Sequence, residues 1–114
     1  MEPTIFHKII SREIPAEILH EDEHCIAIAD IRPVSPTHML VIPKKTLPKL
    51  SDATAADKEL LGHVLLTAQK LAADKGLVEG GYRVVINCGE NAGQTVFQLH
   101  AHVLGGRSFG WPPG

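Results

Sequence analysis

Two histidines lie two residues apart near the C-terminus, in a run that reads GQTVFQLHAHVLGG from Gly93 to Gly106. The apolar residues alternate, which predicts a β-strand whose successive side chains point to opposite faces. Gln98, His100 and His102 are therefore expected on one face. The alternate residues are apolar and are expected in the core: Phe97, Leu99, Ala101 and Val103. Two imidazoles aligned on one face indicate a reactive site more than a packing arrangement, although two satisfied histidines on a sheet are the simpler alternative.

A loop that suits an anion precedes these histidines. Gly93 gives the backbone freedom to turn its N–H groups toward a ligand, and Gln94 and Thr95 add side-chain donors. A phosphate held by this loop would lie beside both imidazoles. One imidazole can then attack phosphorus, while the other binds phosphate oxygens or protonates the leaving group.

Three further polar residues are expected near this site. Asn87 ends a predicted strand and can bond a phosphate or a leaving group, or it simply forms a turn. His38 follows Pro36-Thr37 at the start of another strand and can supply a third imidazole. Asp30 can bond ribose hydroxyls, or it can open the following proline-containing loop as an Asx-turn.

The other histidines and the cysteines are expected to be ordinary. His7, His20, His24 and His63 lie in polar or helical surroundings and are interpreted as surface or packing residues. The two cysteines lack the spacing of a redox or zinc motif, and we expect both to be free thiols.

The hydrophobic pattern predicts an α+β fold: a five-stranded, mainly antiparallel sheet with one long helix and a short N-terminal helix. The short helix covers residues 5–10, with Thr4 as its N-cap. An apolar stripe at three- and four-residue spacing predicts the long helix around residues 60–72, ended by Gly76. The strands are expected at residues 17–20, 25–29, 38–42, 82–87 and in the histidine run.

Composition narrows the class of protein. The 114 residues fit one domain over residues 1–114, with 44% hydrophobic residues. The net charge of −2 gives no basic surface for nucleic acid. No apolar run approaches the length of about 20 residues that a membrane span needs. With no secretory signal visible, we expect a cytoplasmic protein that binds neither membrane nor nucleic acid.

The chain resembles the histidine triad (HIT) superfamily, in particular its Hint branch, nearly from end to end. The motifs that carry the resemblance are, in chain order, Ile5-Phe6 with Lys8-Ile9-Ile10, Glu13-Ile14-Pro15-Ala16, Asp30-Ile31, Pro36-Thr37-His38, Val41-Ile42-Pro43-Lys44-Lys45, Gly81-Tyr82-Arg83, Asn87, Gly93-Gln94-Thr95-Val96-Phe97, His100-x-His102-Val103-Leu104-Gly105-Gly106-Arg107 and Trp111-Pro112-Pro113-Gly114.

This resemblance implies a hydrolase that cleaves the P–N bond of purine nucleoside 5′-phosphoramidates, such as nucleotidylated amines. His100 matches the family nucleophile, which forms a covalent nucleotidyl-histidine. His102 matches the last triad histidine and His38 the fourth family histidine. The resemblance also implies a homodimer whose C-terminal tail reaches the partner's site, and catalysis without metal or cofactor.

The nucleotide-binding positions follow from the same resemblance. The positions that match the phosphate pocket are Asn87, Gly93 and Thr95, with Gln94 beside them. Asp30 matches the ribose-binding carboxylate. The residues expected around the purine (AMP or GMP type) are Phe6, Ile9, Ile28 and Ile31.

Two positions depart from the family pattern. Gln98 replaces the first histidine of His-x-His-x-His, and an amide can orient neighbours but carries no proton at neutral pH. Ile28 stands where relatives usually have phenylalanine. The first departure leaves an alternative, a nucleotide-binding module with weak or no catalysis. A second alternative is a metal site formed by His38, His100 and His102, because His-x-His is also a metal-ligand spacing.

Overall fold

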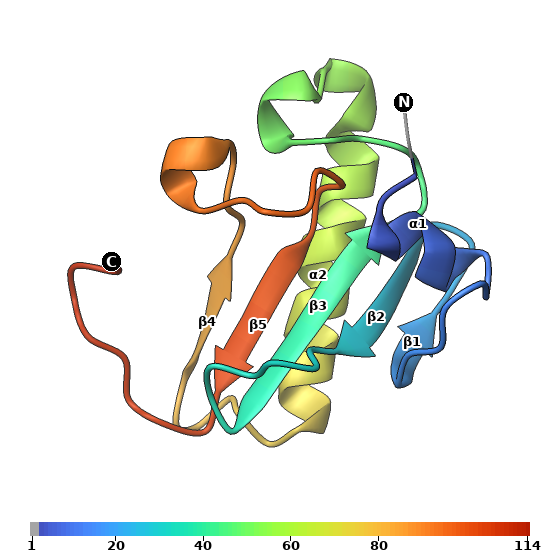
Figure 1. The fold of residues 1–114 in the computed structure, drawn as a ribbon. Coiled ribbons are helices and arrows are strands. Elements are labelled where there is room, and N and C mark those ends of the chain that lie inside the picture. The colour runs from blue at the N-terminus through green and yellow to red at the C-terminus, as the bar shows by residue number, and fades with distance from the viewer. Residues whose placement is uncertain (1–2) are drawn as a thin grey trace.

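The computed structural model describes residues 3–114, in which a five-stranded antiparallel sheet carries one long helix on one face (Figure 1). The strands are β1 (Ile18–Glu21), β2 (Cys25–Ala29), β3 (Thr37–Pro43), β4 (Tyr82–Val85) and β5 (Ala101–Gly105), in the order β1-β2-β3-β5-β4. The helices are α1 (Ile5–Ile10) and α2 (Lys58–Asp74), with short 3-10 turns at Leu50–Asp52, Ala55–Asp57 and Glu90–Ala92. The α+β architecture predicted from the sequence is confirmed.

The alternation of side chains divides the core into two layers. Cys25 and Ala27 of β2 pack with β3 and β5 against the apolar stripe of α2, which includes Val64 and Ala68. The intervening residues of β2 face the other way and pack under α1: Ile26 and Ile28. The sheet thus has a helix-covered back and a front that α1 covers only in part (Figure 1).

Side-chain caps stand at the start of α1 and at the start of the 3-10 turn that precedes α2. Thr4 caps α1 as predicted, and the ring of His7 closes the cap by accepting a hydrogen bond from the Thr4 backbone N–H at 2.9 Å. Thr54 and Asp57 form a similar box in the 3-10 turn that leads into α2. At the C-terminal end of α2, the C-cap is Lys75 and not Gly76 as predicted. Gly76 follows it in the left-handed region of the backbone, at φ = 73°.

The histidine strand is shorter than the sequence pattern predicts. β5 begins at Ala101, and residues 96–98 form a bend before it. Leu99, Ala101 and Val103 are buried as expected, but Phe97 is 41% exposed. The prediction that Phe97 packs in the core is therefore wrong, because a bend does not keep the period-two alternation of a strand.

The central pairing places the histidines beside the apolar front layer. β3 pairs with β5 so that Leu40 lies opposite His102 and Met39 opposite Val103. β4 ends at Val85, so Asn87 lies in the loop beyond the strand. Both cysteines are free thiols, as predicted. Within residues 3–114, no helix has the length and apolar character to cross a membrane, and the cytoplasmic location stays a prediction.

Candidate active site

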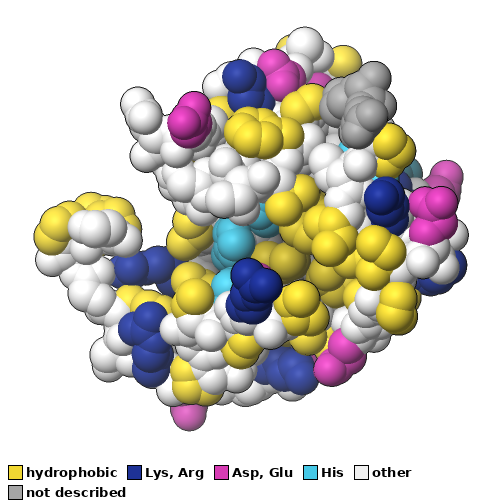
Figure 2. All heavy atoms as spheres, in the orientation of Figure 1, with side chains coloured by type: hydrophobic (Ala, Val, Ile, Leu, Met, Phe, Trp, Pro, Cys, Tyr) yellow, Lys and Arg dark blue, Asp and Glu magenta, His cyan; other side chains and the backbone are white. Residues whose placement is uncertain are grey.

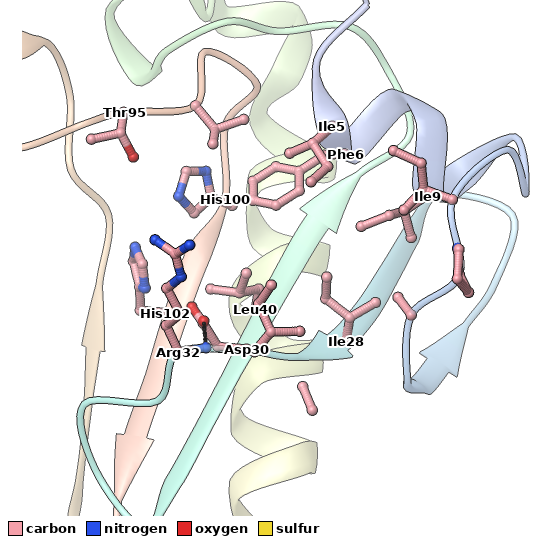
Figure 3. Close-up of a pocket in the computed structure, with 16 residues that line it drawn as sticks. Ile5, Phe6, Ile9, Ile28, Asp30, Arg32, Leu40, Thr95, His100 and His102 are labelled. Carbon is pink, nitrogen blue, oxygen red and sulfur yellow. Dashed lines mark hydrogen bonds between the residues drawn. The ribbon is translucent and has the colours of Figure 1, made fainter.

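A pocket of about 400 Å³ opens on the front of the sheet, next to α1. Figure 2 shows histidine side chains at the bottom of this hollow, with apolar side chains along one side. The apolar wall includes Phe6, Ile9, Ile28, Ile31, Leu40 and Val96. The polar lining comes from Asp30, Arg32, Thr95, His100 and His102 (Figure 3). A volume of this size, with few polar groups against an apolar wall, is typical of a site for a small molecule.

His100 lies directly before β5, and its ring nitrogens are distinguishable by their partners. Nδ1 lies 2.8 Å from the backbone carbonyl oxygen of Gln98, which can only accept a hydrogen bond. Nδ1 therefore carries the hydrogen, and Nε2 keeps a free lone pair. The ring of Phe6 packs edge-on against this imidazole, with 4.8 Å between ring centroids, and fixes its plane.

A chain of hydrogen bonds sets the opposite tautomer in His102. The backbone N–H of Val34 donates to His38 Nδ1 at 3.1 Å, so the hydrogen of the neutral His38 ring is on Nε2. His38 Nε2 then donates to His102 Nδ1 at 2.9 Å. The hydrogen of a neutral His102 ring is consequently on Nε2. The two neighbouring imidazoles, whose centroids are 4.9 Å apart, thus offer a lone pair and an N–H donor respectively.

Burial keeps these imidazoles uncharged near neutral pH. It lowers the pKa of His100, although the Gln98 carbonyl and Asp30 partly oppose this shift. The pKa of His102 falls to about 4, first because of burial and then because of the nearby His100 and His38. Burial also lowers the pKa of His38, against the effect of Asp30, whose Oδ2 lies 3.4 Å from His38 Nε2. Neutral imidazoles are the form in which His100 is nucleophilic.

The side chain of Gln98 points into the protein interior and does not share a face with the histidines, so that sequence expectation is wrong. It is fully buried: its Oε1 accepts from the Leu47 N–H at 3.0 Å, and its Nε2 donates to the carbonyls of Pro43 and Lys45. Gln98 precedes β5, and its amide hydrogen-bonds backbone groups at the end of β3 and in the segment that follows. What Gln98 presents to His100 is its backbone carbonyl.

The loop expected to hold an anion is braced from within. Gln94 is buried: its Oε1 accepts from the Gly89 N–H, and its Nε2 donates to the carbonyls of Pro48 and Val96. Gly93 has φ = 88°, which favours glycine, and Thr95 lines the pocket. The amide of Gln94 therefore holds the loop in shape, and Thr95 is the polar loop side chain that lines the pocket.

The other predicted residues divide between two hollows. Phe6, Ile9, Ile28, Asp30 and Ile31 line the main pocket. Asn87 lines a second hollow of about 360 Å³ that His38 and His102 also border. The Asx-turn alternative for Asp30 holds as well, since its Oδ1 accepts from the Arg32 backbone N–H at 2.7 Å.

Sequence reasoning missed two arginines beside these hollows. Arg32 projects along the main pocket next to Asp30 (Figure 3). Arg107 borders the second hollow, and its guanidinium carbon lies 4.2 Å from the Phe109 ring centroid. The sequence did contain a signal for Arg32, namely a positively charged residue between the Asp-Ile pair and the first proline of the loop. Its direction toward the pocket depends on the turn, which the sequence pattern does not show.

Comparison with known proteins gives the family. The family model of the HIT domain matches residues 11–109. The chain belongs to the HIT family. Among curated HIT relatives, an uncharacterized HIT-like protein of Synechocystis sp. is 58% identical over 113 residues, which are 99% of this chain and 98% of the relative. A 14 kDa zinc-binding protein of Zea mays is 49% identical over 98% of this chain and 88% of its own length.

Solved structures agree with this assignment to the HIT family. The HIT family hydrolase from Legionella pneumophila superposes with a TM-score of 0.96 at 47% identity, covering 98% of this chain and 100% of that chain. The histidine triad nucleotide-binding protein from Candida albicans gives a TM-score of 0.83 at 33% identity, covering 96% of this chain and 83% of that chain.

Proposed function

We propose that this HIT protein is a hydrolase that cleaves the P–N bond of purine nucleoside 5′-phosphoramidates through a nucleotidyl-histidine intermediate. The observation that supports it most is the complementary protonation of two adjacent imidazoles. His100 offers an Nε2 lone pair, and His102 offers an Nε2–H, each fixed by a hydrogen bond at its other nitrogen. Two similar solved structures are named as a hydrolase and as a nucleotide-binding protein, which is consistent with this class of activity.

The first displacement forms the covalent intermediate. The anionic phosphate of the substrate favours uptake of one proton by the hydrogen-bonded His38–His102 pair, next to Asp30. His100 Nε2 attacks phosphorus and the P–N bond breaks. The amine leaves with the proton that the pair delivers through His102 Nε2, because an unprotonated amide nitrogen is a poor leaving group. The Gln98 carbonyl stabilises the positive charge that develops on the His100 ring.

The second displacement releases the nucleotide. Water attacks the phosphorus of the nucleotidyl-histidine and transfers a proton to the His38–His102 pair. His100 leaves as a neutral imidazole with its hydrogen still on Nδ1, and the nucleoside monophosphate is formed. The second step returns to the pair the proton that the first step used, and no atom changes its oxidation state in either step.

The pocket provides a place for each part of a nucleotide. The apolar wall around Phe6, Ile9 and Ile28 suits a purine, and the Asp30 carboxylate suits ribose hydroxyls. The Thr95 side chain suits the phosphate, which then lies beside His100 and His102.

We also propose that the working form is a homodimer. β4 is an edge strand, and the unpaired N–H and C=O groups of an edge strand can pair with another chain. Trp111 in the C-terminal tail is 84% exposed, although a large aromatic side chain is usually covered. In this dimer, the partner's tail is proposed to complete the site at the second hollow, which Asn87 and Arg107 line.

Turnover measured together with binding tests the proposal. Wild-type protein is expected to hydrolyse adenosine 5′-phosphoramidate, whereas His100→Ala is expected to bind AMP with little or no turnover. His24→Ala, an exposed histidine outside the pocket, is the matched control. Calorimetric binding of AMP by a wild-type sample that shows no turnover, with activity restored by Gln98→His, would favour the nucleotide-binding module instead.

Chelation separates this mechanism from a metal site at the same histidines. Ligand atoms of Asp30, His38 and His102 lie within 4.8 Å of one another, so a metal is geometrically conceivable there. The proposed steps use the hydrogen-bonded His38–His102 pair only to give and take a proton, so we expect full turnover in EDTA. Loss of turnover in EDTA, with recovery on adding Zn²⁺, would contradict the metal-free mechanism.

A further inference from the structure

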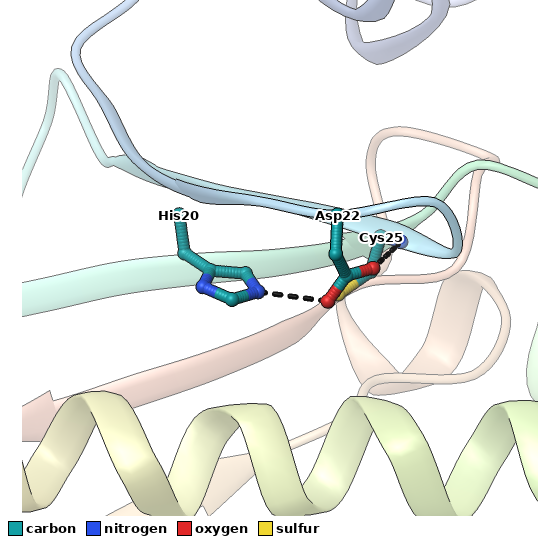
Figure 4. Close-up of side chains that lie close together, drawn as sticks. All are labelled: His20, Asp22 and Cys25. Atoms are coloured by element: carbon teal, nitrogen blue, oxygen red, sulfur yellow. Dashed lines mark hydrogen bonds and ion pairs between the residues drawn. The ribbon is translucent and has the colours of Figure 1, made fainter.

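A second group of potential metal ligands lies away from the pocket, around the turn between β1 and β2. The Oδ2 atom of Asp22 is 2.8 Å from His20 Nε2 and also 2.8 Å from His63 Nε2. The Cys25 sulfur lies 3.7 Å from the same oxygen. The ligand atoms of His20, Asp22 and Cys25 all lie within 4.8 Å of one another (Figure 4). Four side chains with N, O and S donors thus converge, and none of them lines the candidate active site.

The backbone fixes the Asp22 carboxylate in this orientation. Its Oδ1 accepts hydrogen bonds from the N–H groups of His24 and Cys25 at 2.8 and 2.9 Å, which leaves Oδ2 directed at the imidazoles. Burial opposes ionisation, yet the hydrogen bonds from His20, from these two N–H groups and from His63 hold the pKa of Asp22 far below its usual range. The carboxylate is therefore charged and directed at the other donors.

One side of this group is buried against α2, and the other side is exposed to solvent. Cys25 is fully buried against α2, where its sulfur lies 3.7 Å from the Thr67 hydroxyl. The side chains of His20, Asp22 and His63 remain partly exposed, at 23%, 28% and 37%. An ion can reach the group from solvent without unfolding the core.

We propose that His20, Asp22, Cys25 and His63 bind a divalent transition metal of the Zn²⁺ class. Zinc prefers nitrogen, sulfur and carboxylate oxygen in a tetrahedral site, with ligand atoms about 3.3–3.8 Å from one another at normal bond lengths. The contacts of Asp22 Oδ2 with the two imidazoles and the sulfur span 2.8–3.7 Å, so a shift of under about 1 Å suffices there. One oxygen ligand among four donors does not suit Ca²⁺ or Mg²⁺.

Binding replaces hydrogen-bonding protons by the metal. Each imidazole moves its hydrogen from Nε2 to Nδ1, and the Cys25 thiol releases one proton to solvent as its thiolate ligates. Because burial raises the pKa of the Cys25 thiol, this proton is present at neutral pH before the metal arrives. The metal then joins the β1–β2 turn to α2, two segments that lie 41 residues apart along the chain between Asp22 and His63.

The test uses chelator-treated protein titrated with metal alone. We expect Zn²⁺ to bind by calorimetry at one ion per chain in this site, with release of one proton when buffers of different ionisation enthalpy are compared. Co²⁺ should give a thiolate-to-cobalt charge-transfer band, since a cysteine is among the ligands. His63→Gln should weaken Zn²⁺ binding at least about 100-fold. Mutation of residues that only hydrogen-bond a metal ligand already lowers metal affinity by about 10–100-fold.

Matched variants locate the metal. Cys88→Ala should keep the cobalt charge-transfer band and Cys25→Ala should lose it, while circular dichroism checks that both fold. His102→Gln should leave Zn²⁺ affinity unchanged, because that residue belongs to the other group of ligands. Affinity that falls in His102→Gln and stays constant in His63→Gln would place the metal in the pocket and overturn the proposal. Absence of saturable Zn²⁺ binding would overturn it too.

Discussion

Replacement of Gln98 by leucine should separate stability from catalysis. The Gln98 amide is fully buried and makes three hydrogen bonds to backbone groups at the end of β3 and just after it. Leucine is of similar size and removes all three. The Leu47 N–H and the Pro43 carbonyl then lack partners in the interior, whereas the carbonyl of the exposed Lys45 can turn to water.

The expected loss follows from these two orphaned groups. Each buried polar group without a partner costs about 1–3 kcal/mol, so Gln98→Leu should lower the free energy of unfolding by about 2–6 kcal/mol. At about 4 °C per kcal/mol for a chain of this length, the melting temperature should fall by roughly 8–24 °C. Urea unfolding with an unchanged m-value measures the effect.

Two control variants make this prediction specific. Gln69→Leu replaces an exposed amide on α2 and should change stability by no more than about 0.5 kcal/mol. Gln98→His keeps the backbone carbonyl that bonds His100 Nδ1, so turnover per folded molecule and its pH profile should stay close to wild type. A Gln98→Leu protein as stable as wild type would refute the buried role of the amide. A shifted pH profile in Gln98→His would show that a histidine side chain at this position titrates during the catalytic cycle.

Two further predictions concern pH and purine affinity. The pKa of His102 is about 4 in the folded protein and about 6.5 when unfolded, so stability should be constant above about pH 6.5 and fall by roughly 3 kcal/mol toward pH 4. Urea midpoints should show this slope in wild type and less of it in His102→Gln; equal slopes would contradict the assignment. Ile28→Phe should tighten AMP by about two- to tenfold in calorimetry, through an aromatic contact with the base. Unchanged or weaker AMP binding would place the purine elsewhere.

Local patterns predicted most of the scaffold. The apolar runs of β2 and β3 and the apolar stripe of α2 depend only on the geometry of single elements, and all three lie where expected. The face shared by His100 and His102 also followed from alternation, since both line the pocket. The cap formed by Thr4 was visible as a polar residue before an apolar helix.

Long-range contacts explain what the sequence pattern missed. Gln98 turns inward because backbone groups more than 50 residues earlier need partners, and no local pattern records that need. Asp22 and His63 meet only because β1, β2 and α2 lie together in the fold, so His20 and His63 looked like ordinary surface histidines. Their convergence on one carboxylate oxygen is a property of the packed structure.

The nucleophile is tested most directly by intact-mass analysis of protein quenched in base during turnover of an adenosine phosphoramidate. Wild-type protein should carry one adenylyl group, mapped by peptide mass spectrometry to His100. His100→Gln should carry none and should have lost turnover. An adduct on another residue, or turnover above a few per cent of wild type in His100→Gln, would contradict the assignment of His100 Nε2 as the attacking atom.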